Sequence, residues 1–246
     1  MWEDRIPKRR IGTLAPLAAT ENSAYEFYRI APRDVMAIYL PVGLQKFSAA
    51  DVERVFAPID RHVAYLLDRE VDIIVQSGVP LPILIGLAAH DRLLEHIAEQ
   101  SGLPVTSSIT AVVNAARHLG IRNIALANKW SREMNDVLGQ FFGRQGIAVA
   151  GVCSESMTPD KFQKMDTRGG MDLAYELGSR AIRENPDCDG LYVGGGAWLS
   201  LPVVERLEQE FDIPCISNQD AVLWDALHKV NYWRPTTVSN RLLAGT

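Results

Sequence analysis

Two glycine-containing turns, one in each half of the chain, follow short apolar runs and could bind an anion. The first, Ser77-Gly78-Val79-Pro80, follows the run from Val71 to Val75. Such runs are typical of buried parallel strands, and open α/β folds bind ligands beyond the ends of these strands. The Ser77 hydroxyl and the N–H groups of Gly78 and Val79 could donate to a carboxylate or an enolate oxygen. An ordinary strand-to-helix turn explains the same residues equally well.

The second turn, Gly194-Gly195-Gly196, follows the run from Gly190 to Val193. Glycines let a ligand approach the backbone closely because they carry no side chain. The turn lacks the GxGxxG spacing and the acidic residue of a dinucleotide site. We therefore favour a small-anion cradle or a bare turn over a nucleotide site.

Three other side chains could contribute to a site at these turns. His90 falls early in the helix expected after the first turn, where it could supply a proton or serve as a cap or surface residue. Trp130 follows the apolar run of residues 123–128, and its indole N–H could bind a ligand or its ring could pack in the core. Asn22 follows the first apolar run and is either a carboxylate ligand or a helix cap.

Neither the cysteines nor the histidines form a metal motif. Cys153, Cys188 and Cys215 lack metal-ligand and disulfide spacing and lie in or beside expected strands, so we interpret them as core residues. The five histidines form no HExxH pattern. We expect neither a metal nor a cofactor.

The composition of the chain argues against nucleic acid and membranes as binding partners. The 246 residues are 47% hydrophobic and 22% charged, as in an ordinary globular protein, and the net charge is −5. The absence of a long Lys/Arg run argues against nucleic acid. No apolar run approaches the length of about 18 residues that a membrane span needs. An odd cysteine count without a signal peptide indicates a cytoplasmic protein.

Strands and helices are expected to alternate, which predicts an α/β fold with parallel sheets. The expected strands cover 10–16, 34–40, 71–75, 103–107, 123–128, 147–152, 190–193 and 213–217. The expected helices cover 49–69, 89–100, 109–119, 131–145, 166–184, 201–211 and 219–230, and 17–29 is expected to be a loop.

The order of these elements repeats, and residues 102–120 match residues 212–230 in kind: a short strand with proline, a polar turn and a helix. We predict two similar halves, residues 1–120 and 121–246, with the two glycine turns facing a shared cleft. The C-terminal segment is expected to cross back to the first half.

Several segments together resemble the aspartate/glutamate racemase superfamily, most closely its branch of arylmalonate decarboxylases and maleate cis-trans isomerases. They are IGTLAP, ENSAYEFYRIAP, IIVQSGVPLPILIG, GLPVTSSITAVVNAARHLGIRNIALAN and PCISNQDAVLWDAL, and the resemblance extends from about Ile11 to Val230. It implies two pseudo-symmetric α/β halves with the active site between them. It also implies cofactor-independent chemistry on a small carboxylic acid, and it allows a homo-oligomer, since the family often forms small ones.

The chain departs from that family where the resemblance places the reactive thiols. Racemases use two thiols, maleate isomerases add one to a double bond, and arylmalonate decarboxylases keep only the second-half cysteine. Here the two positions match Gly78 and Gly194.

Other positions differ as well. Hydroxyl residues of the decarboxylases match Val79 and Pro80, and a family tyrosine matches Trp130. An asparagine of the isomerases matches Asn22 only with a two-residue gap, and Ala19 without one.

Of the reactions in this family, decarboxylation depends least on the missing thiols. It needs an apolar pocket and hydrogen-bond donors for an enediolate rather than a nucleophile. We expect VPLP (79–82) and Ala197-Trp198-Leu199 to form the apolar wall and the two glycine turns to hold the anion. Water, Ser77 or His90 would supply the proton. The alternatives are a maleate-isomerase-like isomerase, a hydrolase with Ser77 as nucleophile, and a carboxylate-binding homologue without catalysis.

Overall fold

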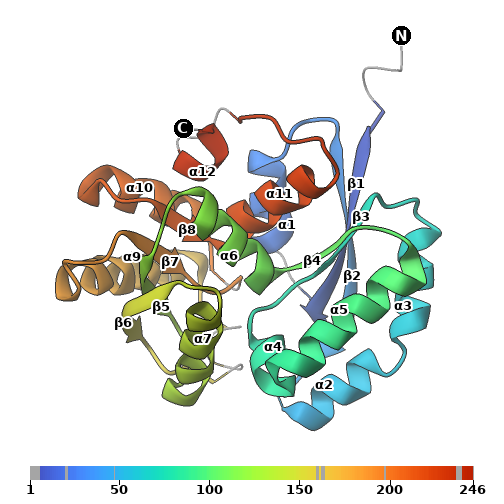
Figure 1. The fold of residues 1–246 in the computed structure, drawn as a ribbon, viewed down its shortest axis with the longest axis horizontal. Helices are drawn as coiled ribbons and strands as arrows, with labels where there is room; N and C mark the ends of the chain where they lie inside the picture. The colour runs from blue at the N-terminus through green and yellow to red at the C-terminus, as the bar shows by residue number, and fades with distance from the viewer. Residues whose placement is uncertain are drawn as a thin grey trace.

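Two four-stranded parallel sheets form the framework of the computed structural model (Figure 1), which describes residues 6–19, 22–46, 48–158, 161, 164–196, 198–236 and 240–245. The strand order is β2-β1-β3-β4 in the first sheet and β6-β5-β7-β8 in the second. The strands are β1 (Arg9–Leu17), β2 (Val35–Leu44), β3 (Ile73–Gln76), β4 (Val105–Ser107), β5 (Asn123–Asn128), β6 (Ala148–Ser154), β7 (Gly190–Val193) and β8 (Cys215–Ser217). The same order occurs twice, which confirms the predicted α/β class with two pseudo-symmetric halves.

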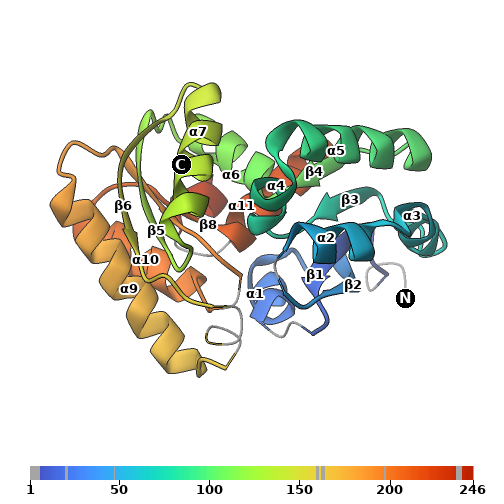
Figure 2. The same ribbon diagram turned by 90° about the horizontal axis from the view of Figure 1, so that it is seen from below.

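Helices flank both sheets, and two of them lie side by side between the halves, α6 and α11 (Figures 1 and 2). The helices are α1 (Asn22–Ile30), α2 (Ala49–Phe56), α3 (Ile59–Leu67), α4 (Pro80–Ile85), α5 (Leu87–Ser101), α6 (Ser108–His118), α7 (Arg132–Arg144), α9 (Thr167–Glu184), α10 (Leu201–Phe211), α11 (Asn218–Lys229) and α12 (Arg241–Ala244).

Two expectations about the first half were wrong. The predicted loop 17–29 contains most of α1, whose buried residues Glu26, Phe27 and Ile30 share one helical face. The predicted helix 49–69 is two helices, α2 and α3. Pro58 separates them, because proline lacks the N–H of a helix interior and its ring clashes with the preceding turn.

The proline-rich segment after β3 is also helical. Helix α4 begins at Pro80, and proline is tolerated in a first turn where the N–H groups have no intrahelical acceptor. This short helix packs its buried Leu81 into the apolar core of the first half.

The two halves share one apolar core, which runs from the first sheet through α6 and α11 to the second sheet. A buried cluster of polar side chains also holds the two halves together. Asp225 of α11 accepts hydrogen bonds from Thr106 Oγ1 at 2.5 Å and from Asn114 Nδ2 at 2.8 Å. Buried carboxylates are tolerated when donors satisfy their oxygens, so this cluster sets how α11 lies against α6.

The C-terminal segment contacts both halves. Tyr232 donates to Asp34 Oδ2 of the first half at 2.5 Å. Farther along the chain, the amide of Arg241 donates to Glu208 Oε2 of the second half at 2.9 Å. The segment after α11 therefore ties the halves together on the side where α6 and α11 meet.

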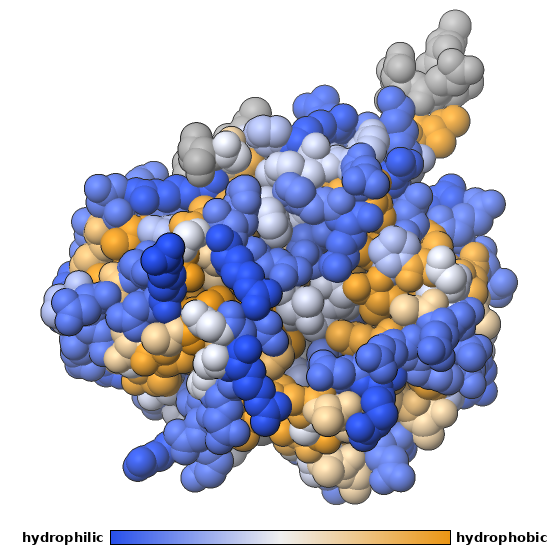
Figure 3. Space-filling model, viewed as in Figure 1, coloured by the Kyte–Doolittle hydropathy of each residue, from blue (hydrophilic) through white to orange (hydrophobic). Residues whose placement is uncertain are grey.

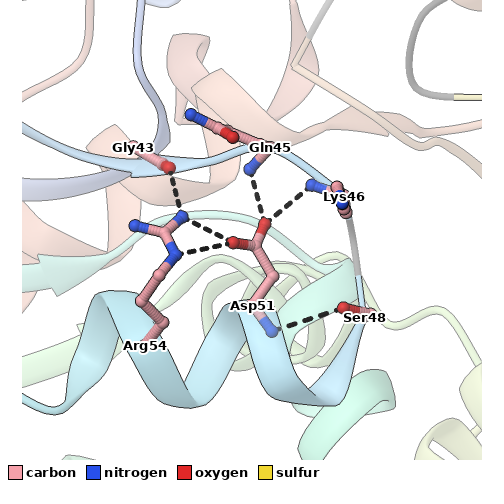
Figure 4. Close-up of polar contacts among 6 residues, drawn as sticks. All are labelled: Gly43, Gln45, Lys46, Ser48, Asp51 and Arg54. Atoms are coloured by element: carbon pink, nitrogen blue, oxygen red, sulfur yellow. Dashed lines mark hydrogen bonds and ion pairs between the residues drawn. The ribbon is translucent and has the colours of Figure 1, made fainter.

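The loop between β2 and α2 is fixed by Asp51 (Figure 4). Its Oδ2 accepts from the amides of Gln45 at 2.6 Å and Lys46 at 2.7 Å, and its Oδ1 accepts from Arg54 Nε at 3.0 Å. Hydrogen bonds from the Lys46 amide, the Arg54 guanidinium and the Gln45 amide lower the pKa of Asp51 to about 2. The carboxylate thus stays ionised and anchors the chain at the start of α2.

Hydrophilic residues cover most of the face in Figure 3, with apolar patches scattered between them. Across the described part of the chain, no helix has both the length and the apolar character to cross a membrane.

Candidate active site

A pocket lies between the halves, where strands of both sheets end. Its empty volume, including the mouth, is about 740 Å³. Its lining comes from the end of β1, from β2, from the turns after β3, β5 and β7, and from the first turns of α1, α6 and α11: Ala15, Pro16, Leu17, Ser23, Tyr39, Ser77, Gly78, Val79, Pro80, Ser108, Lys129, Trp130, Gly195, Gly196, Asn218 and Gln219. Parallel strands and helix N-termini from both halves thus converge on one pocket.

Most of the site residues predicted from the sequence line this pocket, namely Ser77, Gly78, Val79, Pro80, Trp130, Gly195 and Gly196. Asn22, Gly194 and His90 do not. Asn22 is the first residue of α1, and its neighbour Ser23 lines the pocket instead. Ala197, expected in the apolar wall, lies outside the described residues.

His90 lies behind the first turn. It is buried, and its Nε2 donates to Gln76 Oε1 at 2.8 Å. Gln76 Nε2 in turn donates to the Ser77 carbonyl at 2.5 Å. Burial lowers the pKa of His90 to about 4, so the ring is neutral at pH 7. In this geometry His90 supports the turn through Gln76.

The first amide of each glycine turn, that of Gly78 or Gly194, donates to an acceptor within the protein. Gly78 N donates to Ser108 Oγ at 3.0 Å, and Gly194 N continues the sheet by donating to the Ala127 carbonyl at 2.8 Å. Because Ser108 Oγ accepts from Gly78, its own O–H can point elsewhere and donate to a ligand. The amide of Gly78 therefore acts by orienting a hydroxyl.

Asn218 occupies the matching place in the second half. Its Oδ1 accepts from Tyr192 Oη at 2.5 Å and from Gly195 N at 3.3 Å. Two bonds to the oxygen fix the side-chain amide and leave its Nδ2 as the donor for the pocket. Ser108 and Asn218 are each the first residue of a helix, α6 and α11, and helix N-termini favour anions.

Lys129, which we did not single out in the sequence, is the cation of this pocket. It follows β5, is 2% exposed, and its Nζ lies 3.7 Å from the centroid of the Trp198 ring. Burial lowers the pKa of Lys129 to about 7. The described residues that line the pocket include no Asp, Glu or His. A lysine directly after an apolar strand, in the sequence NIALANKW, was the available signal.

No metal centre is apparent in the described ranges, since they contain no group of three His, Cys, Asp or Glu side chains able to hold an ion. The three cysteines are buried and do not line the pocket.

Gly194 is required by the packing of Trp130. A Cβ at residue 194 would lie 2.9 Å from Trp130 Cη2 and 3.0 Å from Tyr192 Cε1. Both distances are too short for carbon atoms in contact, so the indole occupies the space that a side chain there would need. The large residue at 130 and the glycine at 194 are thus coupled.

Gly194→Ala is therefore expected to destabilise the fold by about 1–3 kcal/mol through overpacking. Trp130→Phe removes the indole atoms that clash, so the double variant should recover about 1 kcal/mol relative to the sum of the single changes. Urea unfolding of the four proteins measures this coupling. Strictly additive effects would contradict the account of Gly194.

Glu26 connects the second glycine turn to the first half. Its Oε1 accepts from the amides of Ser200 at 2.6 Å and Leu201 at 2.8 Å, at the start of α10. The carboxyl is 2% exposed, and burial raises the pKa of Glu26 to about 7 in spite of these bonds. The chain that follows Gly196 is thereby anchored to α1.

Because the folded state raises the pKa of Glu26 from 4.5 to about 7, its contribution to stability is largest below pH 4.5 and declines as the pH rises to about 7. Glu26→Gln keeps an acceptor for both amides without the charge. Between these pH values the free energy of unfolding of the wild type should change by up to roughly 3 kcal/mol because of Glu26, and Glu26→Gln should remove this change. Thermal unfolding from pH 4 to pH 8 tests this, and parallel profiles for the two proteins would contradict it.

The fold and the pocket define a class, the pseudo-symmetric α/β proteins in which two like sheets share one cleft. A family model described as arylmalonate decarboxylase matches residues 12–243. The chain is 28% identical over 218 residues to the arylmalonate decarboxylase of Bordetella bronchiseptica, covering 88% of each protein. The chain belongs to the arylmalonate decarboxylase family, a family of enzymes, and the resemblance found in the sequence is confirmed.

Solved structures agree with this assignment. A double mutant of arylmalonate decarboxylase in its liganded form has a TM-score of 0.85 at 25% identity, over 97% of this chain and 100% of that one. A variant of the maleate isomerase Iso from Pseudomonas putida S16 with maleate has a TM-score of 0.84 at 16% identity, over 97% and 98% of the two chains. The second likeness is one of fold alone.

Proposed function

We propose that this protein is a cofactor-independent lyase that decarboxylates a small malonate-type dicarboxylic acid in the pocket between its halves. The observation that carries the proposal is the polarity of the lining, where one lysine and the first residues of two helices meet and no carboxylate is present among the described residues. Such a pocket favours a dianion over a neutral or cationic ligand. Membership of the arylmalonate decarboxylase family supports the same chemistry.

The lining offers both kinds of group that the two carboxylates of such a substrate need, hydrogen-bond donors and apolar side chains. Ser108, Asn218 and Lys129 offer donors to the carboxylate that is kept. Apolar side chains line other parts of the pocket, those of Pro16, Leu17, Val79, Pro80 and Trp130. A carboxylate held among apolar groups loses hydration and departs as CO₂ more readily. The electron pair then remains as an enediolate, whose oxygens the three donors stabilise.

The alternative activities have less support. Isomerisation through a thiol needs a cysteine at the pocket, and none of the described lining residues is one. Ser77 does line the pocket, but the described lining offers neither a histidine nor a carboxylate to activate its hydroxyl. Decarboxylation requires neither group.

The test is CO₂ release from a panel of 2-aryl and 2-alkyl malonates by the purified protein in the presence of EDTA. We expect turnover of at least one malonate, and a fall of about 10²-fold in kcat for Ser108→Ala and for Asn218→Ala. Ser101→Ala, at the end of α5 and outside the pocket, is the control and should leave kcat unchanged. Tight dicarboxylate binding without conversion would contradict the proposal and identify a binding homologue.

A further inference from the structure

Tyr39 of β2 lines the pocket on the side of the first half and is half-buried there. Its Oη donates to the carbonyl of Ser23, in the first turn of α1, at 3.2 Å. Ser23 also lines the pocket, and its Oγ would lie 3.5 Å from a Cβ on Gly196. The hydroxyl end of Tyr39 is thus placed where α1 approaches the second glycine turn, among residues of the pocket wall.

The bond to Ser23 decides what the phenol oxygen can offer a ligand. A carbonyl oxygen only accepts hydrogen bonds, so the single proton of the phenol is directed to Ser23. The lone pairs of Oη remain, and toward the pocket the group acts as an acceptor. Burial raises the pKa of Tyr39, and the nearby Tyr28 and Glu26 raise it further, so the phenol stays uncharged at neutral pH.

An acceptor at this place sorts the parts of a malonate. A carboxylate at neutral pH has only acceptor oxygens, and beside Tyr39 it would set one acceptor against another. Ser108 and Asn218 offer donors instead, because the oxygen of each already accepts from a glycine amide. The carboxylates are therefore favoured near those donors, and the group left to lie near Tyr39 is the substituent on the central carbon.

We infer that Tyr39 is a specificity-determining residue, whose oxygen accepts a hydrogen bond from a hydroxyl or N–H group on the substituent of the substrate. This inference rests on the proposed decarboxylation and names the class of malonate within it. One hydrogen bond at a half-buried place corresponds to a preference of about 5- to 10-fold. A substituent without a donor would leave the phenol oxygen unpaired and would be the poorer substrate.

The experiment measures kcat/KM of CO₂ release from 2-arylmalonates that carry a ring hydroxyl at the 2, 3 or 4 position. Each is compared with its methoxy form, which has a similar effect on the electrons of the ring and no donor. In the wild type at least one hydroxyl form should exceed its methoxy form by about 5- to 10-fold, and Tyr39→Phe should reduce this ratio to about 2-fold or less. Tyr65→Phe, exposed on α3 and outside the pocket, is the control and should keep the wild-type ratio. Circular dichroism verifies that both variants are folded.

Three results would overturn the inference alone. The first is a wild type that prefers none of the hydroxyl forms, and the second is a Tyr39→Phe variant that keeps the preference. The third is an equal loss of kcat/KM for every malonate in Tyr39→Phe, which would assign the phenol to a carboxylate. A wild type that releases no CO₂ from any malonate would overturn the proposed function itself, and this inference with it.

Discussion

Gly195→Ala is expected to lower kcat for malonate decarboxylation by about 10²-fold or more, because the amide of Gly195 donates to Asn218 Oδ1 and so orients a donor of the pocket. Gly195 has φ +120, a conformation that side chains rarely adopt, and its new Cβ would lie 2.9 Å from Lys129 Nζ and 3.2 Å from Cε. The end of the Lys129 side chain or the turn itself must therefore shift to make room for the methyl group. Because the backbone strain adds a cost of about 1–3 kcal/mol, the variant should also unfold at lower temperature.

A matched control separates strain from displacement. Gly86 has φ +84, and a Cβ there would meet nothing within 4 Å. Gly86→Ala should therefore lose stability without losing kcat. If Gly195→Ala keeps the wild-type kcat, or if both variants lose activity equally, the turn at Gly195 does not position Asn218 for catalysis.

Lys129→Met is expected to make the folded protein more stable at neutral pH. Folding lowers the pKa of Lys129 from 10.5 to about 7, so the folded state binds fewer protons than the unfolded state between these values. The wild-type lysine therefore costs stability most at and below pH 7, and this cost declines as the pH rises toward 10.5. Each unit of pKa shift corresponds to about 1.4 kcal/mol, so Lys129→Met should raise the free energy of unfolding by at most roughly 5 kcal/mol.

The measurement is urea unfolding of both proteins from pH 6 to pH 10. The stability difference should be largest at the acidic end and shrink toward the alkaline end. Lys229→Met, at the exposed end of α11, is the control and should show no such trend. A Lys129→Met variant that is less stable than the wild type at pH 7 would mean that folding does not lower the pKa of Lys129.

A gain in stability for Lys129→Met would describe a residue kept at a cost in stability, which is common for groups that do chemistry. A loss of kcat in the same variant would distinguish a functional lysine from a structural one.

The sequence was sufficient for the arrangement of the fold. Glycine-ended apolar runs such as 190–193 mark buried parallel strands, and their order repeats, so the two halves and the shared cleft followed from the pattern. Helix α1 was missed because its sequence is largely polar and its burial includes a contact with the other half, through Glu26. Helix α4 was missed because its prolines suggested only a break.

The site was predictable at the level of the turns and less so at the level of side chains. Gly78 and Gly195 were singled out because glycine marks strand ends, but the internal bonding of their amides depends on tertiary neighbours, Ser108 and Asn218. Lys129 escaped notice because lysines are almost always exposed, and its burial results from the packing of Trp198 and the second turn. His90 was singled out as polar and early in its helix, whereas the fold places it behind β3.

We expect the pocket to form an enediolate and to protonate it once, from one side. The most direct test is to convert a prochiral 2-aryl-2-methylmalonate in D₂O and analyse the monocarboxylate by NMR and chiral chromatography. The account predicts a product with one deuterium on the central carbon, of a single configuration, and CO₂ in equal amount. An equal mixture of configurations, or no product at all, would contradict it.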